Sequence, residues 1–270
     1  TGVSITGTCT ATAFSGDGSA LTGLSAGVTS DSDNNTVGGT NAGQSFSGAT
    51  VNTLFGHSAG QNITSGGDNS IFGGASGDAL TTGSYNAFYG SQSGGSATTS
   101  SYNAFFGSYA GWQCTTGHSN TFVGAQAGDA LTEGNSNTCV GKDSGGALTT
   151  GHSNTCIGND AGKAMTTGYE NVLIGYRTGD SLTTTHLNVA IGLDCFRSQQ
   201  TGSTNVAIGS SAMQYSDTAS GNVAVGAFAL RNVTGSGNVA IGNAGVDVTS
   251  GGNNLLFGAS AGRTASPSGE

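Results

Sequence analysis

The sequence predicts an all-β fold, a single-chain β-solenoid or β-roll of about fourteen coils, each sixteen or seventeen residues long. Three observations predict it. A marker asparagine recurs at a constant interval of seventeen, as at Asn103, Asn120 and Asn137, a glycine follows four residues after each marker, and apolar residues occupy fixed offsets between them. A short, regular period is typical of solenoids, in which each coil buries its apolar residues against its neighbours.

The repeat starts at Asn35 and reaches Asn222 in eleven equal steps without a slip. Two more copies follow at Asn238 and Asn254, and each of these last two steps is shorter by one residue. The chain therefore divides into a lead-in segment at 1–34, the solenoid at 35–262 and a C-terminal tail at 263–270. Within the lead-in, the glycine-punctuated stretch 13–24 is interpreted as a short strand and turn.

Each coil is predicted to contain two short strands. In the copy that begins at Asn120, residues 120–123 form the first strand and residues 130–133 the second, with glycine-containing turns between them. The marker asparagine is expected to form a ladder, since an amide can both donate to and accept from the coil above or below.

Strand alternation assigns the columns to two faces. The residues one and three after the marker are predicted to point inward, together with Ala127 and Leu131, which lie seven and eleven after it. The residue two after the marker is then outward, yet it is apolar where an exposed strand should be polar. A long apolar stripe in water indicates an interface, and cyclic symmetry buries it in every copy. We therefore expect a homo-oligomer, most simply a parallel homotrimer.

The predicted interface column begins with large side chains and becomes small toward the C-terminus, which is interpreted as allowing a closer approach of the chains there. Its candidate interface residues are Leu54, Ile71, Phe88, Phe105, Phe122, Cys139, Cys156, Leu173 and Leu256, with Ala190, Ala207, Ala224 and Ala240 as its small members.

Composition excludes several classes of protein. The net charge is −9 and only six residues are Lys or Arg, so no basic cluster exists for a phosphate backbone and nucleic acid is not an expected partner. No apolar run is long enough to span a bilayer, so membrane insertion is not expected.

The five cysteines show neither a paired framework nor a CxxC zinc pattern. Cys139 and Cys156 fall on adjacent coils, where buried thiols are favoured and a disulfide stays open.

No catalytic, cofactor-binding or metal-binding residues are predicted. Acids nine residues after the marker, such as Asp78, Asp129 and Asp180, are interpreted as solvated turn residues, although a carboxylate pair across an oligomer groove stays open. The histidines His118, His152 and His186 fall on alternate coils, about 10 Å apart, which is too far to share a metal ion.

Two surface features suggest binding. Four aromatic residues, Tyr85, Tyr102, Tyr109 and Trp112, are candidates for glycan contact, since flat rings suit sugar stacking, or for turn packing. A threonine column keeps an ice-binding solenoid open; it includes Thr82, Thr99, Thr116, Thr150, Thr167 and Thr184.

The repeat resembles those of two families. The stretch Asn-Val-Ala-Ile-Gly at 205–209 resembles the head repeat of trimeric autotransporter adhesins, and the longer unit at 149–162 more closely resembles repeats of bacteriophage tail-fibre proteins. The resemblance implies a structural fibre or spike shaft, in a virion tail fibre or otherwise extracellular, that presents a surface to a host-cell glycan or protein. A bacterial surface adhesin or an extracellular filament subunit is the alternative, and an ice-binding solenoid is the second.

Overall fold

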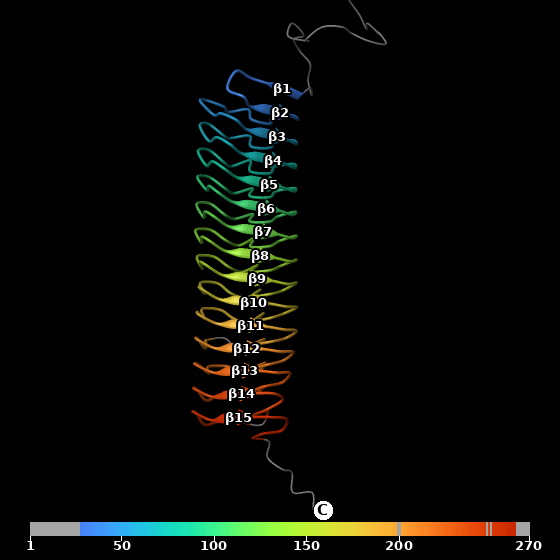
Figure 1. Cartoon of the computed structure of the whole chain (residues 1–270). Helices are drawn as coiled ribbons and strands as arrows, with labels where there is room; N and C mark the ends of the chain where they lie inside the picture. Colours follow the sequence, from blue (N-terminus) through green and yellow to red (C-terminus); the bar gives the residue numbers. More distant parts are fainter. Residues whose placement is uncertain (1–27, 199–200, 247, 249, 263–270) are drawn as a thin grey trace, which may run out of the picture.

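The computed structural model describes residues 28–198, 201–246, 248 and 250–262, and it forms the predicted all-β solenoid. The stretch 13–24, Cys9 and the tail at 263–270 lie outside the described residues. Fifteen strands of three residues stack in sequence order into one sheet, and Figure 1 shows them as the rungs of a straight column. The strands are β1 Val28–Ser30, β2 Thr36–Gly38, β3 Thr53–Phe55, β4 Ser70–Phe72, β5 Ala87–Tyr89, β6 Ala104–Phe106, β7 Thr121–Val123, β8 Thr138–Val140, β9 Thr155–Ile157, β10 Val172–Ile174, β11 Val189–Ile191, β12 Val206–Ile208, β13 Val223–Val225, β14 Val239–Ile241 and β15 Leu255–Phe257.

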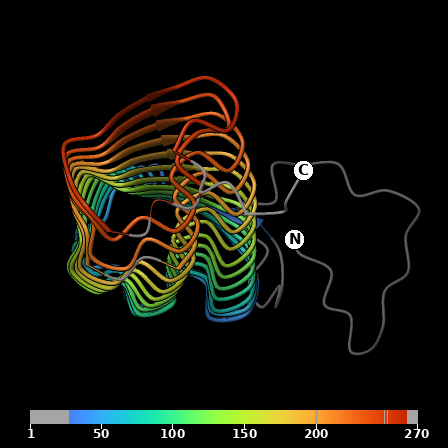
Figure 2. The same cartoon turned by 90° about the horizontal axis from the view of Figure 1, so that it is seen from below.

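Each coil contributes one strand to the sheet, where two per coil were predicted. From β2 to β15 neighbouring strands pair in parallel and in register, and β1 pairs antiparallel with β2 at the N-terminal edge. Figure 2 looks along the stack and shows the strands on one side of the coil, with turns on the others. The predicted second strand at 130–133 fails because the N–H of Leu131 bonds back to Gly128 of its own coil. On either side of it the N–H groups of Ala130 and Thr132 donate to the next coil, 3.2 Å to Gly146 and 2.9 Å to Thr149, but Leu131 breaks the run.

The predicted asparagine ladder is confirmed. Oδ1 of Asn120 accepts the backbone N–H of Asn137 at 2.9 Å and its side-chain Nδ2 at 3.1 Å. The same Nδ2 of Asn137 also donates to the carbonyl of Gly151 at 2.9 Å. Bonds between successive marker asparagines run from Asn35 to Asn254. The buried amides therefore tie each coil to the next.

Asp31 completes the first rung of this ladder. Its Oδ1 accepts the backbone N–H of Asn35 at 2.9 Å, and its Oδ2 accepts the side-chain Nδ2 of Asn35 at 2.9 Å. These bonds favour the ionised carboxyl and lower the pKa of Asp31. The turn between β1 and β2 thus supplies the acceptor that the preceding asparagine supplies elsewhere.

The assignment of the two strand faces was wrong. The middle residue of each strand from β3 to β14 is buried in the core of a single chain, whereas the first and third residues are half-buried or exposed. These middle residues cannot form an interface between chains, because the turns of their own coil already cover them. The corrected residues, all buried, are Leu54, Ile71, Phe88, Phe105, Phe122, Cys139, Cys156, Leu173, Ala190, Ala207, Ala224 and Ala240; Leu256, in the last strand, is half-buried.

The core side chains that were predicted from the turn segments are confirmed. Ala127 and Leu131, which represent the columns seven and eleven residues after the marker, are fully buried. Inside the column the rings of Phe88, Phe105 and Phe122 stack on one another, with centroids 5.0 and 4.9 Å apart. The core is therefore formed by the middle strand residue facing the two turn columns.

An exchange of volume within each coil explains the change from large to small residues along the strand column. Where the middle strand residue is Phe122, the residue eight after the marker is Gly128, and a Cβ there would lie 2.4 Å from the Phe122 ring. Where the middle residue is Ala190, the residue eight after the marker is Phe196, which is fully buried. Met213 and Leu230 fill the same place beside Ala207 and Ala224. The strand and the turn therefore share one core volume, and whichever side chain is larger fills it.

This exchange can be tested by moving the bulk from the strand to the turn. Phe122→Ala alone is expected to cost about 3–5 kcal/mol of stability, because it leaves a cavity. Gly128→Phe alone is expected to clash with Phe122. The double variant should be more stable than either single variant, since φ is 57° at both Gly128 and Phe196. Urea unfolding of the three variants measures this, and additive losses in the double variant would contradict the exchange.

Candidate functional site

The outer face of the sheet carries a column of apolar third residues from β3 to β15, beside a column of first residues that are Thr or Ser in β2–β4 and β7–β9. It is formed by the first and third residues of each strand, and Phe106, Val123 and Ile208 are 40%, 38% and 37% exposed. Near the N-terminal end the rings of Phe55, Phe72, Tyr89 and Phe106 stack in one row, with centroids 4.9–5.3 Å apart. From β10 to β14 the face consists of valine and isoleucine. This surface replaces the predicted interface column as the apolar stripe of the protein.

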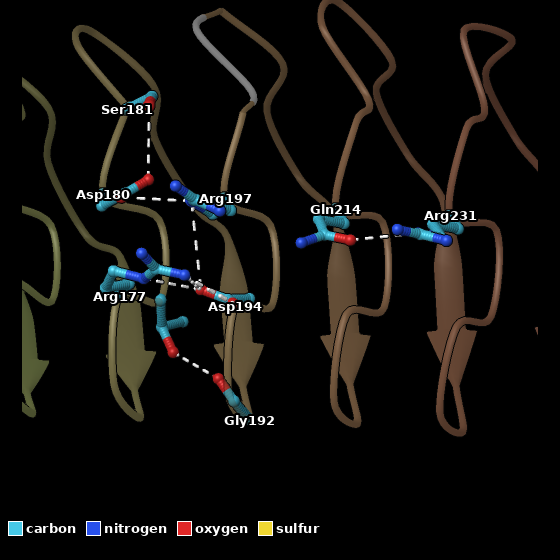
Figure 3. A network of polar contacts seen from close by, with 9 residues as sticks. Arg177, Asp180, Ser181, Gly192, Asp194, Arg197, Gln214 and Arg231 are labelled. Atoms are coloured by element: carbon cyan, nitrogen blue, oxygen red, sulfur yellow. Dashed lines mark hydrogen bonds and ion pairs between the residues drawn. The ribbon is translucent and has the colours of Figure 1, made fainter.

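A charged corner runs along the turn that follows the strand. The Lys and Arg residues within the described ranges lie between five and nine residues after a marker asparagine, and all but Arg231 meet acids of their own or a neighbouring coil. Nη2 of Arg177 lies 2.8 Å from Oδ1 of Asp194, and Nε of Arg197 lies 3.4 Å from Oδ2 of Asp180 (Figure 3). The corner therefore carries ion pairs between coils in addition to the backbone ladder.

Two adjoining hollows lie at the N-terminal end of this corner. The first, of about 360 Å³, is lined by Ser108, Tyr109, Trp112, Ala125, Gln126 and Asp129. The second, of about 500 Å³, is lined by Gln126, Asp129, Asp143, Gly146, Ala147 and Lys163. Because Gln126 and Asp129 belong to both, we treat them as one groove, the Trp112–Lys163 groove.

The repeat places the residues of this groove. The positions nine residues after successive marker asparagines form a column along the stack. In this region the column consists of Gly95, Trp112, Asp129, Gly146 and Lys163. A Cβ at Gly95 would lie 3.1 Å from Cδ1 of Trp112, so the indole packs over this glycine. A Cβ at Gly146 would lie 3.4 Å from Oδ1 of Asp129. The two glycines thus leave room for the indole and for the second hollow.

Charges in the groove are unevenly paired. Lys163 lies 2.9 Å from Oδ1 of Asp160 and 3.6 Å from Oδ2 of Asp143, and Lys142 lies 2.6 Å from the same oxygen of Asp143. Asp129 has no ion pair among the described residues. Partial burial raises its pKa, and the negative charge of Asp143 raises it further. The carboxyl of Asp129, at the centre of the groove, therefore holds its proton more strongly than an ordinary aspartate.

The predicted aromatic set is divided between two corners. Tyr109 and Trp112 line the groove and meet edge to face, with centroids 5.9 Å apart. Tyr85 and Tyr102 lie one residue before their markers, stack with centroids 5.0 Å apart and line neither hollow. Sequence reasoning missed Gln126 and Lys163 as residues of the same groove as Trp112, and it treated Asp129 as a solvated turn residue. The signal was in the spacing: the positions six and nine residues after each marker asparagine lie on the same turn, and comparing these positions between neighbouring coils would have grouped the three residues.

The histidines and cysteines that the sequence singled out do not form a metal site in the described residues. The ring of Tyr169 stacks between His152 and His186, with centroids 5.2 and 4.7 Å away, so these imidazoles do not meet. Within the described ranges, no three His, Cys, Asp or Glu residues are grouped to hold a metal ion. Cys139 and Cys156 are buried free thiols, as favoured. Burial raises the pKa of the Cys114 and Cys195 thiols to about 12.

The threonine column is exposed, as at Thr82 and Thr99. The threonines immediately before it use their hydroxyls within the stack: Oγ1 of Thr98 donates to the carbonyl of Thr115 at 2.9 Å. Each adjacent threonine pair therefore exposes one member, so this corner presents one threonine column and not the two columns typical of ice-binding faces.

Comparison with protein-family models, curated proteins and solved structures finds no match for this chain. In the part of the chain that the structure describes, no helix has the length and apolar character needed to cross a membrane.

The carboxyl of Asp129 provides a test of the groove's electrostatics. Its pKa should lie above the ordinary 3.8, and Asp143→Asn should lower it by removing a neighbouring negative charge. Since the folded chain binds this proton more strongly than the unfolded chain, Asp129 makes the fold less stable as pH rises from the ordinary pKa through the raised one.

A carbon-13 NMR titration of the side-chain carboxyls measures this shift. Asp31, whose pKa is lowered, is the internal control and should not respond to Asp143→Asn. An Asp129 carboxyl that titrates at or below 3.8 would contradict the described environment.

Proposed function

We propose that this protein is the shaft of an extracellular fibre, most specifically a bacteriophage tail fibre, that spans distance and presents a receptor-contacting surface. The observation that carries the proposal is the uninterrupted asparagine ladder from Asn35 to Asn254, which joins every coil to the next. Such a stack converts chain length directly into reach. At about 4.8 Å per coil, the marker asparagines alone span roughly 60 Å.

We further propose that the shaft assembles as a parallel homotrimer through the outer face of the sheet. This face carries a long apolar column, the third residues of β3 to β15, at the surface of the chain, and large apolar stripes on such proteins mark interfaces. If the face is roughly 60 Å long and about 10–15 Å wide, it offers about 600–900 Å² per chain, close to the ~800 Å² that each partner contributes to a standard interface. A second and a third copy are its occupants, because identical stripes are buried by cyclic symmetry.

Adjacent residues of β6 separate this interface from the core. Phe106→Asp places a charge on the outer face and should yield a folded monomer, whereas Phe105→Asp buries a charge between Phe88 and Phe122 and should unfold the neighbouring coils. Mass measurement under native conditions reports assembly, and circular dichroism reports folding. A wild-type mass of 26.2 kDa, that of one chain, would contradict the trimer, as would a Phe106→Asp variant that still assembles.

The cellular role is tested by locating the protein. Gold-labelled antibodies are raised against the purified chain and applied to a sample of the bacterial cells and phage particles in which the gene occurs. In electron micrographs they should mark the tail fibres of the phage particles. Labelling confined to bacterial surfaces would replace the tail-fibre proposal with the adhesin alternative. Labelling confined to the cell interior would contradict an extracellular shaft.

A further inference from the structure

We infer that the Trp112–Lys163 groove binds a neutral oligosaccharide. The inference rests on the proposed function in one respect: it gives the receptor-contacting surface of the shaft a place and a ligand class. The groove crosses four successive coils, those that begin at Asn103, Asn120, Asn137 and Asn154. Three coil steps of about 4.8 Å make it roughly 14 Å long, which suits a short linear chain of sugars lying along the stack.

One end of the groove provides an aromatic platform. Trp112 and Tyr109 are 37% and 41% exposed, yet both are fixed in place: the indole packs over Gly95, and the tyrosine ring meets its edge. An exposed ring that is already held in position loses little freedom when a ligand binds. Indole and phenol rings combine an apolar face with a polar edge, which matches the C–H face and hydroxyls of a sugar ring.

The middle of the groove provides hydrogen-bonding groups. Gln126 is exposed, and its side-chain amide makes no hydrogen bond to another described residue, so both its donor and its acceptor are available. The carboxyl of Asp129 has no side-chain partner among the described residues, and it accepts hydroxyl donors when ionised. Gly146 leaves the space beside this carboxyl open, so a ligand can pass from the indole toward Lys163.

Charge selects the ligand class. Asp129 and Asp143 line the groove, and the one cation that lines it within the described ranges, Lys163, is engaged by Asp160 and Asp143. Phosphate, sulfate or carboxylate groups on a ligand would meet like charge at the centre of the groove and find no unengaged cation among these residues. Sugar hydroxyls meet acceptors instead. The groove thus favours neutral sugars over sialylated or sulfated ones.

Binding to immobilised oligosaccharides tests the inference. The panel contains neutral hexose and N-acetylhexosamine oligosaccharides and an anionic arm of sialylated and sulfated ones. Wild type should bind members of the neutral arm. Trp112→Ala should weaken that binding at least about tenfold, the loss typical of an aromatic anchor that the bound ligand covers. Gly146→Leu, which fills the second hollow from a different residue, should weaken it as well.

Tyr85→Ala is the matched control, because Tyr85 is an aromatic residue outside the groove that is more exposed than Trp112, and this variant should bind like wild type. Thermal unfolding of each variant separates lost binding from lost folding. The inference is overturned if wild type binds no neutral oligosaccharide, if it prefers the anionic arm, or if Tyr85→Ala loses as much as Trp112→Ala. Because antibody labelling locates the fibre independently, failure here leaves the shaft proposal standing and removes only the groove as its receptor site.

Discussion

The hydrogen bonds between buried asparagines are the constraint on which the rest of the structure depends. Each internal side chain donates to the amide oxygen of the preceding marker and to a turn carbonyl, and its own oxygen accepts two N–H groups from the next coil. If one coil shifted by one residue relative to its neighbour, these buried polar groups would lose their hydrogen-bond partners, at a cost of about 1–3 kcal/mol for each group. The two shorter steps keep the same bonds, at Asn238 and Asn254, so the missing residue is absorbed elsewhere in the coil.

Sequence alone predicted the period, the marker ladder and the turn columns of the core, because each follows from spacing and from what buried amides require. It placed the wrong strand face inward, because apolar residues occur on both faces, although the first strand residue, on the outer face, is Thr or Ser in β2–β4 and β7–β9. The physical signal for that decision was present in the pairing of Phe122 with Gly128 and of Ala190 with Phe196. When a large side chain at one position always accompanies a small one at the other, both side chains occupy the same space in the core. The middle strand residue therefore had to point toward the turn. The second predicted strand failed for a local reason, since the N–H of Leu131 is used within its own coil.

The same geometry explains why the surfaces differ from one another. A parallel stack repeats every offset along a line, so one residue type at one offset creates a row, as with the apolar third strand residues on the sheet face. Beyond Asp143 the corner is charged, whereas Tyr109 and Trp112 place two aromatic rings on it in a single coil. Tyr109 and Trp112 were predicted as contact residues, but Gln126, Asp143 and Lys163 were not, because they come from three other coils. A functional site on such a protein is a local irregularity in a regular array, and it becomes visible when residues are compared down each column.

Hydrogen exchange of the asparagine side-chain amides, followed residue by residue by NMR, tests the ladder most directly. The Nδ2 protons of the markers from Asn52 to Asn238 should exchange only when neighbouring coils separate, far more slowly than those of Asn135, a half-exposed asparagine two residues before a marker. Exchange of the marker protons at the rate of Asn135 would show that these side chains reach solvent and would contradict the ladder as the element that holds the coils in register.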